Sequence, residues 1–105
     1  MDPQMKRGLL EVCVLAALAR QDSYGYRIIK ELSPCIEISE STLYPILKRL
    51  QSGQCLTEYS QEHNGRLRKI YHLTDNGRQR IAAFLSEWQD VMEVYRFIEG
   101  EWKND

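Results

Sequence analysis

The fold is decided by residues 39–73, which read SESTLYPILKRLQSGQCLTEYSQEHNGRLRKIYHL. Apolar residues recur there on one helix face and predict a helix that Ser39 or Ser41 caps and Gly53 ends. The residues of this face are Leu43, Ile46, Leu47 and Leu50. Asn64-Gly65 then separates two runs rich in β-branched and aromatic residues, which is a strong signal for a β-hairpin. The stretch therefore predicts a helix followed directly by a hairpin.

Two further helices are expected before this stretch. The first begins after Asp2, and the nearly unbroken apolar run Leu9–Leu18 indicates that most of its faces are buried. The second is capped by Ser23 and ends before Pro34. Three helices followed by a hairpin are the element order of a winged helix-turn-helix domain, which we assign to residues 1–74.

The C-terminal part of the chain, residues 75–105, predicts one long helix. Thr74 caps it, and no proline interrupts about 40 Å of helix before Trp102. Its apolar and aromatic residues recur every three or four positions over three heptads, which is more apolar surface than one small chain can cover. We therefore expect a C-terminal dimerisation helix that pairs with a second copy of the chain. The expected dimer interface comprises Ile81, Phe84, Leu85, Trp88, Val91, Tyr95 and Ile98.

These elements together predict a mainly α fold with a small β-hairpin, in which the winged helix-turn-helix and the long C-terminal dimerisation helix form one compact unit. A chain of 105 residues can bury one modest core but rarely supports a catalytic cleft as well. No apolar run approaches the roughly 18 residues of a membrane span, and the N-terminus lacks the apolar run of an export signal. We expect a cytoplasmic protein with no membrane partner.

Charge is distributed unevenly along the chain. The 14 Lys and Arg residues and 15 Asp and Glu residues give a formal net charge of −1, which taken alone argues against nucleic acid. Divided by segment, residues 1–38 carry a net charge of 0, residues 39–72 carry +2 and residues 73–105 carry −3. The positive excess therefore falls on the helix and the hairpin where a DNA-binding surface needs it.

Double-stranded DNA is accordingly the expected partner. The expected contacts are Ser41, Thr42, Tyr44, Lys48 and Arg49 of the helix, and Arg66, Arg68 and Lys69 of the hairpin. The alternatives are a solvated basic surface, helix capping for Ser41 and Thr42, and packing for Tyr44.

Cysteine and histidine patterns indicate no catalytic or metal chemistry. Cys13, Cys35 and Cys55 form no CxxC motif, so we expect free thiols in a reducing compartment. A redox sensor is the less favoured interpretation, because none of them has an activating neighbour in the sequence. His63 is expected on the surface of the turn and His72 on the exposed side of its strand, without ligand-spaced partners. We expect no metal, no cofactor and no enzymatic activity.

Several blocks of the chain resemble the PadR-like transcriptional regulators, in particular their small subgroup with a single C-terminal helix. The resemblance implies a winged-helix homodimer that binds a pseudo-palindromic operator and represses its own or a neighbouring operon. It further implies release from DNA when a small-molecule effector binds. The matching blocks are Tyr24-Gly25-Tyr26, the run STLYPILKRL at residues 41–50, GRLRK at residues 65–69 and YHLTDNG at residues 71–77.

The effector site follows from resemblance to the multidrug-sensing members of the family. Their matching tryptophan stacks flat aromatic compounds between the two subunits, a role that would fall here to Trp88. The implied lining of this site is Val91 and Met92, with Met5, Gly8 and Val12 of the first helix. The alternative is that Trp88 anchors the dimer core, because Phe84 stands where the drug-binding members have a small residue.

A second class of function remains open at this stage. A winged-helix protein can use its C-terminal helix to bind another protein without touching an operator. Such a module would form a dimer or heteromer with no affinity for its own upstream DNA.

Overall fold

The chain folds into four helices and one two-stranded antiparallel sheet, which confirms the predicted mainly α fold with a small β-hairpin. Its structure, a computed structural model, describes residues 1–104. The expected C-terminal segment 75–105 therefore ends one residue outside the described part. The elements are α1 (Pro3–Ala19), α2 (Gly25–Leu32), α3 (Glu40–Ser52), β1 (Leu56–His63), β2 (Arg66–Leu73) and α4 (Asp75–Lys103).

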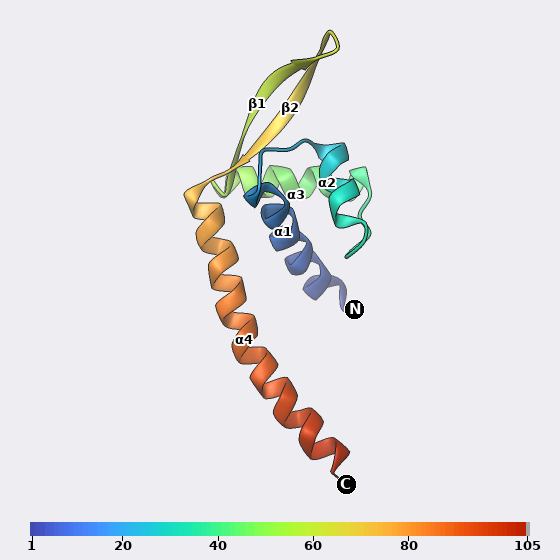
Figure 1. Cartoon of the computed structure of the whole chain (residues 1–105), viewed down its shortest axis with the longest axis vertical. Helices are drawn as coiled ribbons and strands as arrows, with labels where there is room; N and C mark the ends of the chain where they lie inside the picture. Colours follow the sequence, from blue (N-terminus) through green and yellow to red (C-terminus); the bar gives the residue numbers. More distant parts are fainter. Residues whose placement is uncertain (105) are drawn as a thin grey trace.

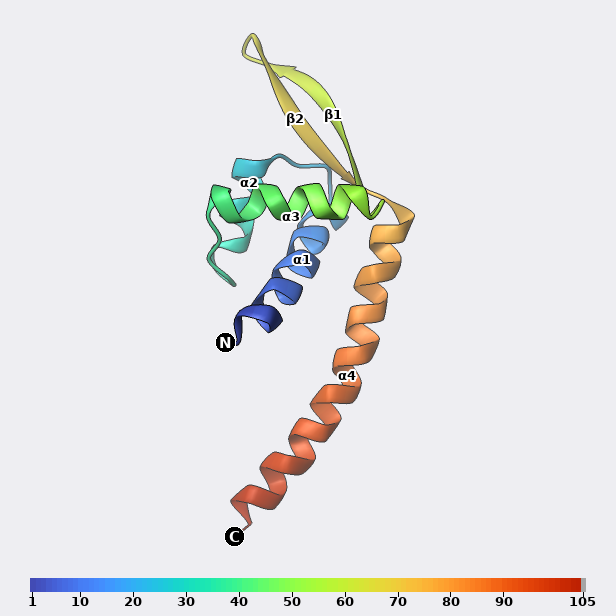
Figure 2. The same ribbon diagram turned by 180° about the vertical axis from the view of Figure 1, so that it is seen from behind.

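The first three helices pack into one group, from which the hairpin extends on one side and α4 on the other (Figure 1). Seen from behind, α3 crosses in front of α1 and α2 at the base of the hairpin (Figure 2). The core lies where these helices meet the hairpin base, and Leu15, Ile28, Leu43 and Leu56 are fully buried there. Across residues 1–104, no helix combines enough length with an apolar sequence to cross a membrane.

Helix α3 begins and ends as its sequence indicates. The hydroxyl of Ser39 accepts a hydrogen bond from the backbone N–H of Thr42, so Ser39 is the capping residue of the two serines considered. The predicted apolar face is buried, and Gly53 follows the last helical residue. The left-handed backbone conformation belongs to Gln54, with φ of 61°, and not to Gly53. One side of α3 is thereby fixed to the core, and its other side faces outward.

The prediction that Ser23 caps the second helix is wrong. Helix α2 starts at Gly25 after Tyr24, without a side-chain cap. The backbone of Ser23 is instead extended and pairs with Tyr71 of β2 through two hydrogen bonds of 3.1 and 2.7 Å. The connection between α1 and α2 thereby pairs with the edge of the hairpin. Ser23 is buried, and this pairing supplies the hydrogen-bond partners that its buried backbone groups need.

The expectation that most faces of α1 are buried is also wrong for the single chain. One side of the helix packs into the core through Leu10, Val14, Leu15 and Leu18. The opposite side faces α4 across an open cleft, so its apolar residues are only partly covered.

The hairpin has the tight turn that Asn64-Gly65 predicts. Strands β1 and β2 pair from Leu56 opposite Leu73 to His63 opposite Arg66, which leaves two residues in the turn. Asn64 and Gly65 have φ of 51° and 79°, as a two-residue turn between right-twisted strands requires. The base of the hairpin is apolar and buried, whereas its basic tip extends into solvent.

A single threonine joins the hairpin, α3 and α4. The Thr74 hydroxyl accepts a hydrogen bond of 3.1 Å from the Gly77 backbone N–H and donates one of 2.7 Å to the Gln54 carbonyl oxygen. The first bond caps α4 as predicted, and the second holds the start of α4 against the end of α3. Gly77 is buried at this junction, against the Cys55 backbone and the Leu73 side chain.

Replacing Gly77 with alanine is therefore expected to destabilise the fold by about 1–3 kcal/mol. A methyl group there would overlap the Cys55 carbonyl oxygen and the Leu73 side chain, so backbone must move. The matched control is Gly100→Ala in the same helix, where a methyl group meets nothing. This control is expected to be neutral or to add about 0.5–1 kcal/mol, because alanine is the better helix former. Equal unfolding free energies of both variants in urea titrations would contradict the tight junction.

Candidate nucleic-acid interface

The outward face of α3 carries the predicted contact residues. Pro45 also lies on this face, and the opposite face is fully occupied by core packing. All five contact residues of the helix are solvent-exposed, namely Ser41, Thr42, Tyr44, Lys48 and Arg49. The helix therefore presents a continuous polar and basic surface between its first turn and its last.

Two of these residues also contact the capping residue of α3. The Ser39 hydroxyl lies 3.0 Å from the Ser41 hydroxyl and donates to the Thr42 hydroxyl at 3.1 Å. This small cluster orders the first turn of α3 while its oxygens remain at the surface. Ser39 is the capping residue, so the Ser41 and Thr42 side chains only contact the cap hydroxyl through their own hydroxyls, which remain at the exposed surface.

The hairpin and α3 meet at an aromatic cleft. The Arg68 guanidinium lies 3.9 Å from the ring centroid of Tyr24, a cation–π contact that holds β2 against the start of α2. The hydroxyl of Tyr44 packs over Gly25, where a Cβ would lie 2.8 Å from it. Tyr44, Arg68 and Lys69 consequently line one cleft of about 480 Å³. Residues predicted from two separate elements are brought together there, whereas Arg66 lies further out, next to the turn.

Arg49 has a partner that sequence reasoning missed. Its Nε atom lies 3.3 Å from one carboxylate oxygen of Glu11 in α1, and Arg80 of α4 donates to the other oxygen at 2.7 Å. Only 14% of the Glu11 side chain is exposed, so this carboxylate holds two arginines in a partly desolvated position. Glu11 therefore links the last turn of α3 to the first turns of α4.

A second missed residue, Asp22, holds the base of the hairpin. One of its oxygens lies 2.7 Å from His72 Nδ1, and the other accepts a 2.7 Å hydrogen bond from the Tyr59 hydroxyl. The hydrogen bond with His72, followed by that from Tyr59, lowers the pKa of Asp22 below its ordinary value. His72 is exposed as expected, and it also belongs to a polar contact between the two strands and the loop before α2.

Replacing Asp22 with asparagine is expected to destabilise the protein at neutral pH and to matter less in acid. Because the folded-state pKa of Asp22 is lowered, its stabilising contribution is present above the ordinary range of about 4. It is lost as the pH falls through the lowered folded-state pKa. Unfolding free energies of the wild type and of Asp22→Asn at pH 7 and at about pH 3 check this, with Asp90→Asn in α4 as the control. An equal difference in unfolding free energy between the wild type and Asp22→Asn at both pH values would contradict a stabilising role of the ionised carboxylate.

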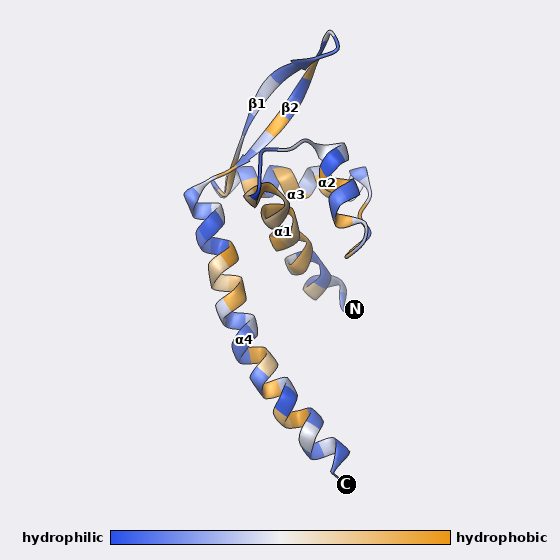
Figure 3. Cartoon of the chain, in the orientation of Figure 1, coloured by the Kyte–Doolittle hydropathy of each residue, from blue (hydrophilic) through white to orange (hydrophobic). Residues whose placement is uncertain are grey.

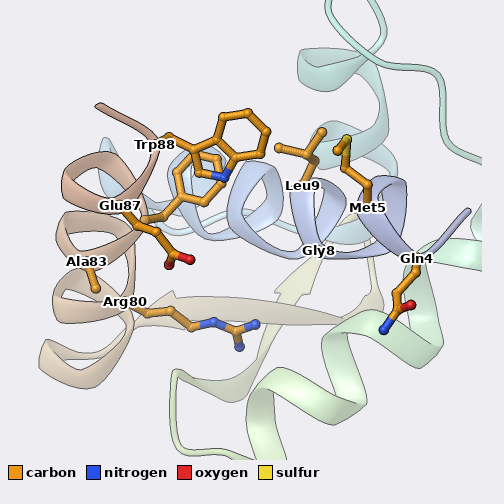
Figure 4. Close-up of a pocket in the computed structure, with 9 residues that line it drawn as sticks. Gln4, Met5, Gly8, Leu9, Arg80, Ala83, Glu87 and Trp88 are labelled. Carbon is orange, nitrogen blue, oxygen red and sulfur yellow. The ribbon is translucent and has the colours of Figure 1, made fainter. Parts of the chain in front are cut away.

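The predicted effector residues are only partly brought together. Met5 and Gly8 of α1 and Trp88 of α4 line a cleft of about 370 Å³ between these helices. Figure 4 shows the Trp88 ring reaching toward Leu9 and Met5, with Arg80 at the other side of the opening. Val12, Val91 and Met92 do not line this cleft in the single chain.

Phe84 lies beside Trp88. This position is the one on which the alternative depends, in which Trp88 anchors the dimer core and binds no effector. The two ring centroids are 5.7 Å apart and the ring planes are inclined by 37°. Phe84 therefore occupies one side of the Trp88 ring, and the side toward α1 stays open.

The apolar stripe of α4 is largely uncovered in the single chain. Figure 3 shows apolar residues recurring along the whole helix, including the half that extends beyond the helical group. Ile81, Phe84 and Trp88 are half-buried, whereas Leu85, Val91, Tyr95 and Ile98 are exposed. Among residues 1–104, no group of three or more His, Cys, Asp and Glu side chains forms a metal-binding cluster.

The arrangement of elements agrees with comparisons to known proteins. The model of the transcriptional regulator PadR-like family matches residues 14–83, which include α2, α3, the hairpin and the start of α4. The chain belongs to the PadR-like family of transcriptional regulators. The resemblance found in the sequence is thereby confirmed, as is the expectation that this chain is not an enzyme, because the PadR-like proteins are regulators.

Solved structures of PadR-like and related proteins share most of this fold. Smu.1704 from Streptococcus mutans is 44% identical, with 82% of this chain and 81% of that chain covered and a TM-score of 0.75. A PadR-like transcription factor from Bacteroides fragilis is 32% identical, with coverage of 90% and 94% and a TM-score of 0.81. PadR from Bacillus subtilis, solved in complex with operator DNA, is 26% identical, with coverage of 73% and 46% and a TM-score of 0.69.

Proposed function

We propose that this PadR-like regulator is a homodimeric repressor that binds a pseudo-palindromic operator in double-stranded DNA, before its own or a neighbouring operon. The cleft that unites Tyr44 of α3 with Arg68 and Lys69 of the hairpin carries this proposal. When a helix of this kind lies in the major groove, a flanking basic wing is placed to contact the adjacent phosphate backbone. The Bacillus subtilis relative, which was solved in complex with operator DNA, supports operator DNA as the partner.

The proposed contacts divide by chemistry. Ser41, Thr42 and Tyr44 stand at the N-terminal half of α3, where short polar side chains reach base edges or phosphates. The cationic residues bind phosphate oxygens and release counterions, and Glu11 sets the position of the arginine at the end of α3. These cations are Lys48, Arg49, Arg66, Arg68 and Lys69.

The proposed homodimer joins two copies through α4. Residues 1–74 form the DNA-reading part and residue 75 begins the dimerisation part in this proposal. Exposed Leu85, Val91, Tyr95 and Ile98 would form a large apolar patch on a monomer, and pairing removes it from water. A two-fold arrangement with recognition helices about 34 Å apart suits two half-sites one DNA turn apart.

Electrophoretic mobility shift with the DNA upstream of the gene tests this function. We expect one dimer per pseudo-palindromic site and a steep fall in affinity as salt rises. A dimer with no affinity for this DNA at low salt would refute the repressor and favour a protein-interaction module that uses the C-terminal helix.

We further propose that a planar aromatic effector binds the cleft beside Trp88. The open side of the Trp88 ring offers a stacking surface, and Met5 and Gly8 provide the facing wall. Arg80 lines this cleft and also bonds Glu11, which in turn bonds Arg49 of α3. A ligand that displaces Arg80 would therefore disturb a residue of the DNA-facing helix through a single carboxylate.

Replacing Trp88 with alanine is expected to abolish quenching of tryptophan fluorescence by planar aromatic compounds. Trp102 remains as the fluorophore in this variant, and it lies near the exposed end of α4. The matched control, Trp102→Phe, is expected to retain the quenching and its saturation. Unchanged quenching in Trp88→Ala would exclude the stacking role and leave Trp88 as a packing residue.

A further inference from the structure

Two of the three cysteines line one cleft, which shares no lining residue with the Trp88 cleft or with the cleft at the hairpin. Cys13 lies on α1 and is half-buried, and Cys35 lies in the turn after α2 and is exposed. Both line a cleft of about 470 Å³ between these helices. The sequence separates the two residues widely and suggested no relation between them, so only the packing of α1 against α2 reveals the pair.

The surroundings of the cleft leave room for the two sulfur atoms. Ala16 and Ala17 contribute small side chains to the lining, while Arg20 and Glu31 contribute opposite charges. The backbone holds Cys35 in a defined turn, because its N–H donates to the Leu32 carbonyl oxygen at 2.9 Å. Neither cysteine is used by the proposed DNA-binding surface or by the Trp88 cleft.

The two thiols differ in accessibility, since Cys13 is half-buried and Cys35 is exposed. Burial raises the pKa of Cys13, and the nearby Cys35 thiolate raises it further. Cys13 is therefore a poor first target for an oxidant, whereas Cys35 is directly accessible.

We infer that Cys13 and Cys35 form a peroxide-oxidisable dithiol, which closes to an intramolecular disulfide between α1 and the turn that leads toward α3. This dithiol is separate from the residues of the proposed repressor function, and it would give this regulator a reversible response to hydrogen peroxide. A closed disulfide restrains residues 33–39, the connection that precedes the N-terminal cap of α3.

The chemistry proceeds in two steps. The Cys35 thiolate attacks one peroxide oxygen, the O–O bond breaks, and hydroxide leaves to give a sulfenic acid. The Cys13 thiolate then attacks the Cys35 sulfur, the S–O bond breaks, and a second hydroxide leaves. The two hydroxides take up the two protons lost by the thiols. In total, two thiols are oxidised to one disulfide while one hydrogen peroxide is reduced to two waters.

Peptide mass spectrometry of the full chain tests this inference. Trypsin places each cysteine on its own peptide, residues 8–20 for Cys13, 31–48 for Cys35 and 50–66 for Cys55. The folded protein is treated with hydrogen peroxide, alkylated with iodoacetamide under denaturing conditions and digested without reduction. We expect peptides 8–20 and 31–48 joined with the loss of two hydrogen atoms, and their separation by dithiothreitol.

Cys55 is the internal control. It is 7% exposed, and its thiol donates to the Gly53 carbonyl oxygen at 3.7 Å, so it should remain fully alkylated after treatment. Cys35→Ser, an exposed and structurally mild change, is expected to leave Cys13 unoxidised. The inference is overturned if Cys13 and Cys35 are alkylated as in untreated protein, or if Cys35 stops at sulfinic acid. It is also overturned if the disulfide joins two chains or includes Cys55.

Discussion

Replacing Lys48 and Arg68 together with alanine is expected to weaken operator binding on the order of 100-fold or more at moderate salt. Lys48 stands on the outward face of α3, and Arg68 stands where the hairpin meets that helix. Each subunit loses two phosphate contacts, so a dimer loses four and the slope of log affinity against log salt falls by about 4. Mobility shifts over a salt series measure both quantities.

The matched control removes two cations far from the proposed surface. Arg96 and Lys103 lie in the distal half of α4, which points away from the hairpin (Figure 1). Their double alanine variant is expected to keep the affinity and the salt slope of the wild type, which separates a local contact from a general charge effect. Equal weakening by both double variants would contradict the assigned surface, and circular dichroism of each variant excludes unfolding as the cause.

Replacing Val91 and Ile98 with glutamate is expected to convert the dimer to a monomer at micromolar concentration. Both side chains are exposed on the single chain and belong to the apolar stripe of α4. In the proposed dimer they would place four unpaired carboxylates in an apolar interface, and each costs several kcal/mol. The dimer Kd should therefore rise on the order of 1,000-fold or more. Sedimentation equilibrium measures this change directly.

The control for the dimer places the same two charges on the other face of the helix. Gln79 and Ser86 are exposed and lie on the side of α4 opposite the apolar stripe. Their double glutamate variant is expected to remain dimeric. A dimer of unchanged stability in Val91→Glu/Ile98→Glu would show that another surface joins the subunits.

Local rules explain which parts could be predicted from the sequence. The buried face of α3, the Asn64-Gly65 turn and the Thr74 cap depend on residues within a few positions of one another. The outward face of α3 followed from the same periodicity, because a helix with one buried face must expose the other.

Contacts between distant residues explain what sequence reasoning missed. Asp22 meets Tyr59 and His72 across separations of 37 and 50 residues, and Glu11 meets Arg80 across 69. Sequence periodicity does not encode such pairs. The wrong prediction for Ser23 has the same origin, since its backbone pairs with Tyr71 of β2 and does not begin a helix. The relation between Cys13 and Cys35 likewise exists only once α1 and α2 have packed.

The Thr74 junction gives α4 the geometry of a lever arm. A helix of 29 residues is about 43 Å long, so a rotation of five degrees at its first turn displaces its far end by almost 4 Å. In the proposed dimer α4 is held against its partner along the stripe from Ile81 to Ile98, and the same rotation would instead change the separation of the two DNA-reading parts. The Thr74 hydroxyl, which bonds both the end of α3 and the start of α4, thereby fixes the angle between the DNA-reading part and α4. In the dimer this angle sets the separation of the two recognition helices, which must match one turn of the DNA helix.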